Sequence, residues 1–542
     1  MTAEFDYIIV GAGSSGCVLA GRLSEDPATR VLLLEAGPPD RSLWLHLPIG
    51  YGKTMWSANY NWRFETEPEP TMARRRIYWP RGKTLGGCSA INGLIYIRGQ
   101  RQDYDHWASL GNTGWSYADV LPYFIRSEGN LRGASTYHGA SGPLKVSDIG
   151  ARHPLIEAFI HGANEMGVPR NEDFNGPEQT GAGYYQLNTF KGWRCSTATA
   201  FLKPARQRRN LVIQTNAICT GLIFVGKRAV GVRYRQDGVL KEAHCTTEVL
   251  LAAGAVQSPQ LLQLSGIGPK ALLARHGIPL VHNAPDVGSN LQDHLQIRLG
   301  YECSQPITTN DQLNNWVGKL RIGLQWLLQR SGPLAVGINQ GGCFMRALPE
   351  VSRDGTALER PDIQFHVATL SADMAGGQVH PYSGFTLSVC QLRPESRGHI
   401  HIRSANPLEP PEISANYLST ERDQRTAVAA VKAARAMAAS AALRPYVRRE
   451  VKPGPEVKED ADILSFCRQH GATIFHPVGT CRMGLDAGAV VDPRLRVNGI
   501  QGLRVVDCSV MPTLVSGNTH AAAVMLAEKA VDMIREDHQT PR

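Results

Sequence analysis

The hydrophobic positions at the start of the chain follow the pattern of a strand–loop–helix–strand unit. Residues Phe5–Val10 form a continuous apolar run, and a glycine-rich segment extends over Gly11–Gly16. Apolar residues then recur at roughly helical spacing up to Leu23, and a second apolar run covers Val31–Leu34. Two buried parallel strands joined by a short helix open a doubly wound sheet, so the pattern predicts a Rossmann-like α/β domain.

Other strand-like patterns fall into groups further along the chain. Alternating patterns predict strands at Leu211–Gln214, Gly231–Tyr234 and Val249–Ala252. A second group is predicted to form half-buried strands that face a pocket, at Asp362–Thr369, Phe385–Leu392 and His399–Arg403. Near the C-terminus, Leu503–Asp507 is predicted as a strand that ends in an acid, and His520–Ile534 as an apolar helix.

The length of 542 residues is too great for one ordinary core, so two lobes are expected. Because the C-terminal pattern returns to the style of the first unit, we expect a discontinuous cofactor domain formed by residues 1–297 and 474–542. Residues 298–473 are expected to form an α+β substrate-binding domain built on an antiparallel sheet. Part of residues 130–190 is expected to belong to this second lobe.

The composition is that of a soluble globular protein, with 42% hydrophobic and 19% charged residues. Eleven cysteines are scattered without a C-x-x-C pair, which argues against a disulfide framework and against a zinc site, so no metal is expected. The net charge of +9 includes the run Arg74–Arg76, but no aromatic residues are interleaved with it. We therefore expect no nucleic-acid partner, and attribute the basic residues to solvated faces or to an anionic cofactor or substrate.

Membrane and secretory segments are not expected either. The most apolar helical stretch, Thr426–Val447, is interrupted by Lys432, Arg435 and Arg444, which makes a bilayer crossing unfavourable. The N-terminus enters a strand at once and leaves no room for a signal peptide, so the expected location is cytoplasmic.

The glycine-rich segment G-A-G-S-S-G predicts a dinucleotide site. Gly11 permits the tight turn, Gly13 lets the backbone approach a pyrophosphate, and Gly16 lets the helix pack close to the strand. The N-terminus of that helix would face the phosphates, and Glu35, at the end of the second strand, would accept hydrogen bonds from a ribose. Ser14, Ser15 and Ala36 are assigned to the same site. From this motif alone, FAD and NAD both remain possible.

Two further glycine-containing segments suggest contact with a flat ligand. In Arg81–Asn92, the small residues around Gly86 and Gly87 permit backbone to lie directly against such a ligand. Gly254–Gly268 is predicted as a turn, a short helix and a second turn, with Pro259 in the first helical turn, where proline is tolerated.

The segments 82–92 and 254–268 resemble the two sequence signatures of the glucose–methanol–choline oxidoreductase family. Further similar segments are Ser396–Pro407, His476–Gly484 and Val505–Pro512, so that the resemblance extends from Phe5 to about Ile534. It implies FAD rather than NAD, and the chemistry of a choline dehydrogenase-like, FAD-dependent alcohol dehydrogenase.

The resemblance places the catalytic histidine of the family at His476. Its second catalytic position, which is His or Asn in different members, is placed at His520 within S-G-N-T-H-A. The implied reaction oxidises a primary or secondary alcohol to an aldehyde or ketone, with hydride transfer to flavin N5. One histidine, expected to be His476, takes the hydroxyl proton, and the other holds the same oxygen from the opposite side. Which of the two is the formal base stays open at this stage.

The family resemblance also implies the contacts of the cofactor. The residues assigned to it, besides those of the first motif, are Gly82, Gly86, Gly87, Asn92, Cys219, Asp507 and Thr519. Asn92 is expected near the flavin ring, Asp507 near the ribityl or pyrophosphate group, and Cys219 near the adenine through its backbone. Some choline-oxidising relatives attach FAD through a histidine at the position held here by Ile91, so non-covalent FAD is predicted.

The substrate and the electron acceptor are less constrained. Trp62, Phe344, Phe365 and Phe475 are candidates to line an apolar pocket. The same motifs resemble dehydrogenases of choline and of aliphatic, aromatic and polyethoxylated alcohols. The acceptor is expected to be a quinone-type carrier or oxygen, and a dehydrogenase is favoured. Two alternatives stay open: a non-redox lyase similar to hydroxynitrile lyases, and a flavin-bearing protein without turnover.

Overall fold

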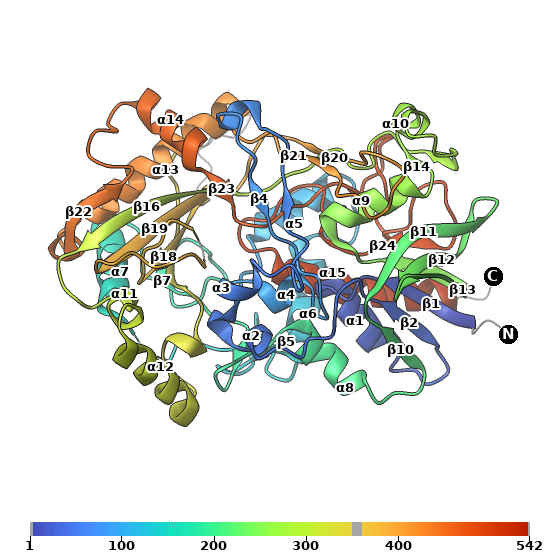
Figure 1. The fold of residues 1–542 in the computed structure, drawn as a ribbon, viewed down its shortest axis with the longest axis horizontal. Helices are drawn as coiled ribbons and strands as arrows, with labels where there is room; N and C mark the ends of the chain where they lie inside the picture. Colours follow the sequence, from blue (N-terminus) through green and yellow to red (C-terminus); the bar gives the residue numbers. More distant parts are fainter. Residues whose placement is uncertain (1–3, 151, 349–359, 375, 540–542) are drawn as a thin grey trace.

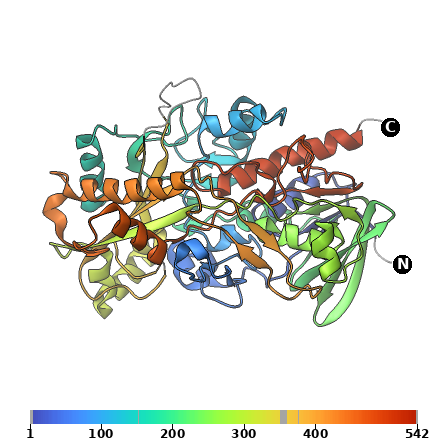
Figure 2. The ribbon, with the colours of Figure 1, turned by 90° about the horizontal axis from the view of Figure 1, so that it is seen from above.

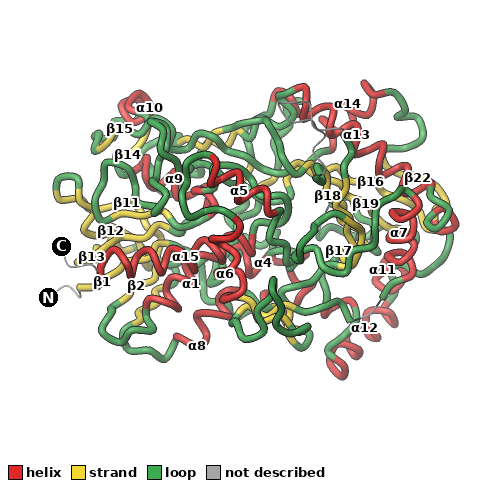
Figure 3. The backbone as a smooth tube through the Cα atoms, turned by 180° about the vertical axis from the view of Figure 1, so that it is seen from behind, coloured by secondary structure: helices red, strands yellow, loops and turns green. Residues whose placement is uncertain are grey.

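The computed structural model describes residues 4–150, 152–348, 360–374 and 376–539. Two large sheets lie at opposite ends of the molecule, and both chain termini lie beside the first sheet (Figure 1). Seen from behind, the strands gather at these two ends, with loops and helices between them (Figure 3).

The first sheet contains seven strands, in the order β10–β2–β1–β13–β12–β11, with β24 also paired to β13. Their bounds are Glu4–Val10 (β1), Val31–Leu34 (β2), Leu211–Gln214 (β10), Ala217–Val225 (β11), Arg228–Gln236 (β12), Val239–Leu251 (β13) and Leu503–Val505 (β24). The four pairings β1–β2, β1–β13, β2–β10 and β13–β24 are parallel. This arrangement confirms the predicted Rossmann-like sheet.

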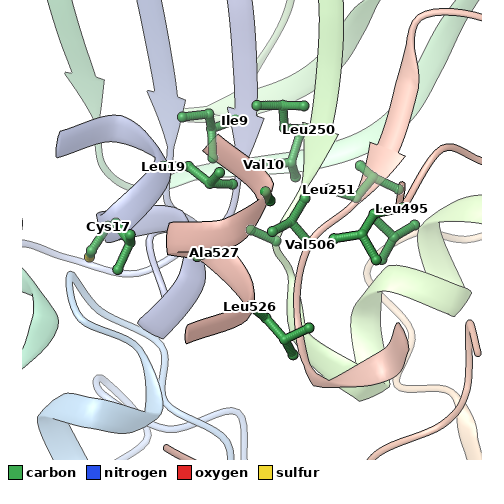
Figure 4. Packing of buried hydrophobic residues seen from close by; sticks show 14 of the residues in the cluster. Ile9, Val10, Cys17, Leu19, Leu250, Leu251, Leu495, Val506, Leu526 and Ala527 are labelled. Carbon is green, nitrogen blue, oxygen red and sulfur yellow. The ribbon is translucent and has the colours of Figure 1, made fainter. Parts of the chain in front are cut away.

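The core of the first domain explains why β1 and β2 are continuously apolar. Helices α1 (Ser14–Leu23) and α15 (His520–Gln539) pack against each other and against the sheet. Ile9 of β1, Leu19 of α1 and Leu526 of α15 are fully buried in one cluster (Figure 4). The last strand and helix of the chain therefore complete the domain that the first forty residues begin. Seen from above, α15 runs toward the end of the molecule that holds both termini (Figure 2).

The second sheet is antiparallel throughout, with the order β22–β16–β19–β18–β17–β7 and with β23 also paired to β16. The bounds are Gly181–Tyr184 (β7), Leu295–Cys303 (β16), Asn339–Met345 (β17), Ile363–Ala368 (β18), Gly384–Gln391 (β19), Val447–Lys452 (β22) and Ala472–Thr473 (β23). The sheet contains β7, from within residues 130–190, and the proposed domain boundary at residues 297–298 falls inside β16. We keep the division into two domains as a proposal.

Strands β18 and β19 are buried along their whole length, so the prediction that they are half-buried was wrong. Alternate residues such as Phe365 and Leu387 belong to a core that also contains residues of α13 (Glu421–Ala439). The intervening residues, such as His366 and Ser388, line a cavity. Polar side chains on these strands are therefore buried as deeply as the apolar ones.

His399–Arg403 does not join the second sheet, contrary to the prediction. Its strand β20 (His399–His401) pairs only with β21 (Glu412–Ser414). The other edge of β20 is closed by Gln263, which donates to the Ile400 carbonyl and accepts from the Ile402 amide. The segment therefore packs on helix α9 (Gly254–Leu264).

Helix α9 contains Pro259 at its sixth residue rather than in its first turn, where it was predicted. A proline there cannot donate the hydrogen bond that the Ala255 carbonyl would accept in a regular helix. Thr480 Oγ1 donates to that carbonyl instead, at 2.6 Å. The side chain of Thr480 is fully buried, and it compensates for the proline.

The remaining helices and short strands connect these layers. The helices are Leu43–His46 (α2), Tyr51–Thr54 (α3), Cys88–Ile91 (α4), Arg101–Ser109 (α5), Tyr117–Ser127 (α6), Pro154–Glu165 (α7), Lys203–Ala205 (α8), Lys270–Arg275 (α10), Thr309–Leu313 (α11), Trp316–Gln329 (α12) and Asp460–His470 (α14). The short strands are Phe64–Glu65 (β3), Tyr78–Trp79 (β4), Glu128–Asn130 (β5), Leu144–Val146 (β6), Thr189–Phe190 (β8), Trp193–Arg194 (β9), Ile267–Gly268 (β14) and His282–Asn283 (β15). Among the described residues, no helix combines the length and the apolar character that a membrane crossing requires.

Candidate active site

A cavity of about 680 Å³ lies between the two large sheets. One wall comes from the loops that follow β1, β2 and β24, and the opposite wall comes from β16, β18 and β19. Ligands of doubly wound sheets bind at the carboxyl ends of the strands, which is where the first wall lies. The predicted site residues that line the cavity are Gly11, Gly13, Ser14, Ser15, Glu35, Ala36, Gly82, Gly87, Asn92, Cys219, His476, Asp507, Thr519 and His520. Gly16 and Gly86 do not line it.

The glycine-rich loop after β1 has the shape of a phosphate cradle. Gly11 has φ +97°, and a Cβ there would lie 2.6 Å from the Ala252 carbonyl oxygen. A Cβ on Gly87 would lie 2.7 Å from Gly13 Cα, so the two glycine segments touch backbone to backbone. Gly13 caps α1 without a side-chain hydrogen bond, which leaves the first helix amides available to an anion. Gly16 lies behind this surface, where any Cβ would overlap the Gly11 carbonyl.

Glu35 connects the two loops that surround the predicted ribose position. Its Oε2 accepts from the Ala12 amide at 2.9 Å, and its Oε1 accepts from the Gly37 amide at 2.8 Å. Burial raises the pKa of Glu35 to about 7. The carboxylate lines the cavity and has lone pairs left to accept from ribose hydroxyls.

Asp507 holds the end of β24 against the start of α9. Its Oδ2 accepts from the Gly254 amide at 2.9 Å and from Ser258 Oγ at 2.6 Å, while its Oδ1 accepts from the Ser509 amide at 2.8 Å. Gly254 lines the cavity, and a Cβ on it would meet nothing within 4 Å. The aspartate therefore fixes a turn that presents bare backbone to a ligand.

Asp293 fixes the backbone at His476 through a network of hydrogen bonds. The Asp293 carboxylate accepts from the His476 amide at 2.7 Å and from Thr473 Oγ1 at 2.5 Å, and Tyr417 OH donates to the same carboxylate. Thr473 Oγ1 in turn accepts from the amide of Phe475, which has the left-handed φ of +72°. This network imposes an unfavourable backbone conformation directly before the histidine, which is typical of functional sites.

The tautomer of His476 follows from its contact with His294. His294 Nε2 lies 3.0 Å from the Leu392 carbonyl, which only accepts, so Nε2 carries the proton. Burial lowers the pKa of His294 to about 4, so the ring is neutral and its Nδ1 is an acceptor. His294 Nδ1 lies 3.0 Å from His476 Nδ1, which must therefore donate. The lone pair of a neutral His476 is consequently on Nε2.

Asn518, not His520, stands next to that lone pair. Asn518 Nδ2 lies 3.3 Å from His476 Nε2, and Asn518 lines the cavity. His520 Nδ1 instead lies 3.1 Å from Ser14 Oγ at the start of α1, and its Nε2 has no hydrogen-bond partner within the described residues. The expected placement of His520 opposite His476 is therefore not what the structure shows. The expectation that the second position is His or Asn fits Asn518 two residues earlier.

The wall formed by the second sheet was not predicted residue by residue. It contributes Gln296, Arg298, His366, Thr386 and Ser388. These occupy alternate positions on β16, β19 and β18, so the period of two in each strand was the signal that could have identified them. Of the predicted aromatic residues, Trp62 and Phe475 line the cavity, whereas Phe344 and Phe365 are fully buried in cores.

Family models described as GMC oxidoreductase match residues 5–296 and 394–527. The chain therefore belongs to the GMC (glucose–methanol–choline) oxidoreductase family. It is 43% identical over 534 residues to the alcohol dehydrogenase (acceptor) of Pseudomonas putida, covering 98% of this chain and 95% of the relative. It is 45% identical over 540 residues to the oxygen-dependent choline dehydrogenase of Yersinia pseudotuberculosis serotype O:1b (strain IP 31758), covering 98% and 94%.

Solved structures agree with this assignment. Pyridoxine 4-oxidase from Mesorbium loti is 31% identical, with a TM-score of 0.88 and coverage of 99% of this chain and 100% of that one. Formate oxidase from Aspergillus oryzae RIB40 is 25% identical, with a TM-score of 0.92 and coverage of 99% of both chains. This chain is thus an FAD-dependent oxidoreductase that acts on CH–OH groups.

Proposed function

We propose that this protein oxidises an alcohol to an aldehyde or ketone, with His476 Nε2 as the base that takes the hydroxyl proton. The observation that carries the proposal is the contact between His294 and His476, which supports a lone pair on Nε2 inside the cavity. Burial, followed by the electrostatic influence of His294, His366 and Arg81, holds the pKa of His476 well below its ordinary value. His476 is therefore neutral at neutral pH and ready to accept a proton.

Bound FAD supplies the acceptor for the hydride that leaves the alcohol carbon. The residues proposed to hold it are the glycine-rich loop, Glu35, Asn92 and the backbone at Gly254. Ile91 lines the cavity with an aliphatic side chain that offers no nucleophile, which supports non-covalent binding. Denaturation in acid or guanidinium should release all of the flavin into the filtrate; flavin that stays with the chain would contradict this.

Asn518 is proposed to donate from Nδ2 to the substrate oxygen, beside His476 Nε2. An amide at this position stabilises the negative charge that develops as the hydroxyl proton leaves. His520 is proposed to act on the cofactor side, because its ring contacts Ser14 in the phosphate-binding turn. Burial lowers the pKa of His520 to about 4, so that it faces the cavity as a neutral ring.

The test is an anaerobic titration of the yellow holoenzyme with alcohols, following flavin absorbance. Benzyl alcohol, medium-chain alkanols, a polyethylene glycol, choline and hydroxy acids make up the panel. At least one class should bleach the flavin, and His476→Ala should slow bleaching by roughly 10²–10⁴-fold while a chemical reductant still reduces it. Air then distinguishes an oxidase from the proposed dehydrogenase. If no alcohol reduces the flavin while dithionite does, the redox proposal fails and a lyase becomes the better explanation.

A further inference from the structure

A row of polar side chains crosses the cavity wall that the second sheet forms. His366 of β18, Ser388 of β19 and Arg298 of β16 lie directly opposite one another in the antiparallel register, and all three line the cavity. Residues directly opposite in neighbouring strands share a face of the sheet. The row begins near the base, because Gln364, two residues before His366 on β18, donates to Asn518 Oδ1, and Asn518 Nδ2 lies 3.3 Å from His476 Nε2. It ends at a guanidinium two strand spacings away, about 10 Å at the backbone.

Arg298 has no carboxylate partner within the described residues. Its Nε donates to Gln296 Oε1 at 3.1 Å, and the remaining guanidinium donors have no hydrogen-bond acceptor among those residues. The acids that line the cavity are Glu35, Asp507 and Glu409. The first two lie after β2 and β24, on the opposite wall, and Glu409 belongs to the segment that packs on α9. Arg298 is half-buried in the cavity wall, where a guanidinium without a carboxylate is costly unless a ligand pairs with it.

A second donor stands near this arginine. Tyr51 OH accepts from the Ile338 amide at 3.1 Å, which leaves its own hydrogen for a ligand. Tyr51 lines the same cavity as Arg298, and Ile338 immediately precedes β17, a strand of the sheet that holds Arg298. A guanidinium fork and a neighbouring hydroxyl are the groups that bind a carboxylate.

We propose that the substrate is an alcohol that carries a carboxylate, which Arg298 binds while the hydroxyl group lies at His476. The proposal rests on the function proposed above, because it places the oxidised carbon beside that histidine. It introduces no new chemical step: the hydroxyl proton and the hydride leave as before, and the carboxylate is unchanged. It predicts hydroxy acids rather than choline, despite the similarity of the chain to choline dehydrogenases.

Binding of a quaternary ammonium is disfavoured by the same wall. The ammonium charge would lie near Arg298, on a wall of the cavity that has, among the described residues, no acidic side chain to balance it. Trp62, one of the two predicted aromatic residues that line the cavity, is already covered by a cation of the chain, since Lys83 Nζ lies 4.7 Å from its ring centroid.

The experiment measures binding without turnover to the oxidised holoenzyme. Acetate, butyrate and benzoate are titrated, each against its amide, and the perturbation of the flavin spectrum gives each dissociation constant. At least one carboxylate should bind on the order of ten- to a hundredfold more tightly than its amide, as expected for a charge-assisted pair. Arg298→Met should abolish this preference, and Arg298→Lys should keep part of it. Arg233→Met, which removes an exposed arginine of β12, serves as the matched control.

Two outcomes would overturn the proposal: no preference for any of the three carboxylates in the wild-type enzyme, or a preference that survives in Arg298→Met. The wild-type comparison stands even if a variant fails to fold. A kinetic arm compares 4-(hydroxymethyl)benzoate with benzyl alcohol and choline, and Arg298→Met should lower kcat/KM only for the acid. The binding measurement needs no reaction, so it can fail while the proposed function holds. The proposed function fails only if no alcohol reduces the flavin.

Discussion

His294 fixes the proton of His476 although it does not itself line the cavity. If it did not accept from His476 Nδ1, the two neutral tautomers of His476 would compete, and the one with a proton on Nε2 could not act as a base. His294 is therefore a positioning residue. Its effect should appear in the rate of the chemical step rather than in substrate affinity.

Replacing His294 with Leu should lower kcat by roughly 10- to 100-fold and leave KM nearly unchanged, because the hydrogen bond that sets the tautomer of His476 is lost. His294→Asn, which retains an acceptor near the Nδ1 position, should recover part of the rate. Steady-state kinetics on both variants, with flavin content as the control, checks this. Equal losses in the two variants, or a change confined to KM, would point to a purely structural role.

Asn518 and His520 are separated by one residue, yet they should give different phenotypes. Asn518→Ala should reduce the rate of flavin reduction by roughly 10- to 100-fold with FAD fully bound, since one hydrogen bond to the reacting oxygen is removed. His520→Ala should mainly weaken FAD retention, because the ring contacts Ser14. Stopped-flow reduction and flavin-to-protein ratios separate the two effects. A His520 variant that retains FAD but loses the rate of reduction would restore the expected histidine pair.

The separation of His520 from His476 shows what sequence reasoning misses at this scale. The segment S-G-N-T-H-A contains both residue types that the family accepts, and spacing does not decide which one faces His476. Gly517, with φ +143°, redirects the backbone directly before Asn518. A Cβ on it would collide with Ile97, a contact from a segment over four hundred residues away that the sequence does not reveal.

At the level of elements, α9 depends on a side chain from a distant loop. Thr480→Val keeps the shape but leaves the Ala255 carbonyl buried and unpaired, which should cost about 1–3 kcal/mol. The matched control is Thr220→Val, whose hydroxyl makes an exposed hydrogen bond at 3.2 Å. Urea denaturation, followed by flavin and tryptophan fluorescence, should show a lower unfolding midpoint for the first variant only. Equal midpoints for both would show that α9 tolerates its proline without help.

Strands with continuous apolar runs were predicted correctly from the sequence, whereas the burial of strands that alternate polar and apolar residues was not. Strands β2 and β10 have the predicted bounds because their apolar runs match burial between helices and neighbouring strands. In β18 and β19 the polar alternation predicted half-buried strands that face a pocket. The polar side chains do line the cavity, but they are as buried as the apolar ones. The pattern of β20 is that of a strand in a larger sheet. Its second edge, however, is hydrogen-bonded by the Gln263 side chain rather than by another strand.

At the scale of the whole molecule, the proposed catalytic centre lies in the cavity where the two sheets meet. The motifs of the first domain and the segment around His476 could be found by their glycines and by family resemblance. Arg298 and His366 carry no motif, and only the register of the second sheet brings them to the same wall. The sequence therefore predicted the residues on the first domain's wall of the cavity far better than those on the second sheet's wall.

The most direct test of the account is the pH dependence of anaerobic flavin reduction by a good alcohol substrate. Because His476 must be neutral to accept a proton, and because its pKa is held below the ordinary value of 6.5, the rate should be constant at neutral pH. It should fall as a single proton is taken up below pH 6.5, and His476→Ala should lose this dependence along with most of the rate. A rate that still rises with pH above neutrality, or a His476→Ala enzyme that keeps the wild-type profile, would contradict the assignment of His476 as the base.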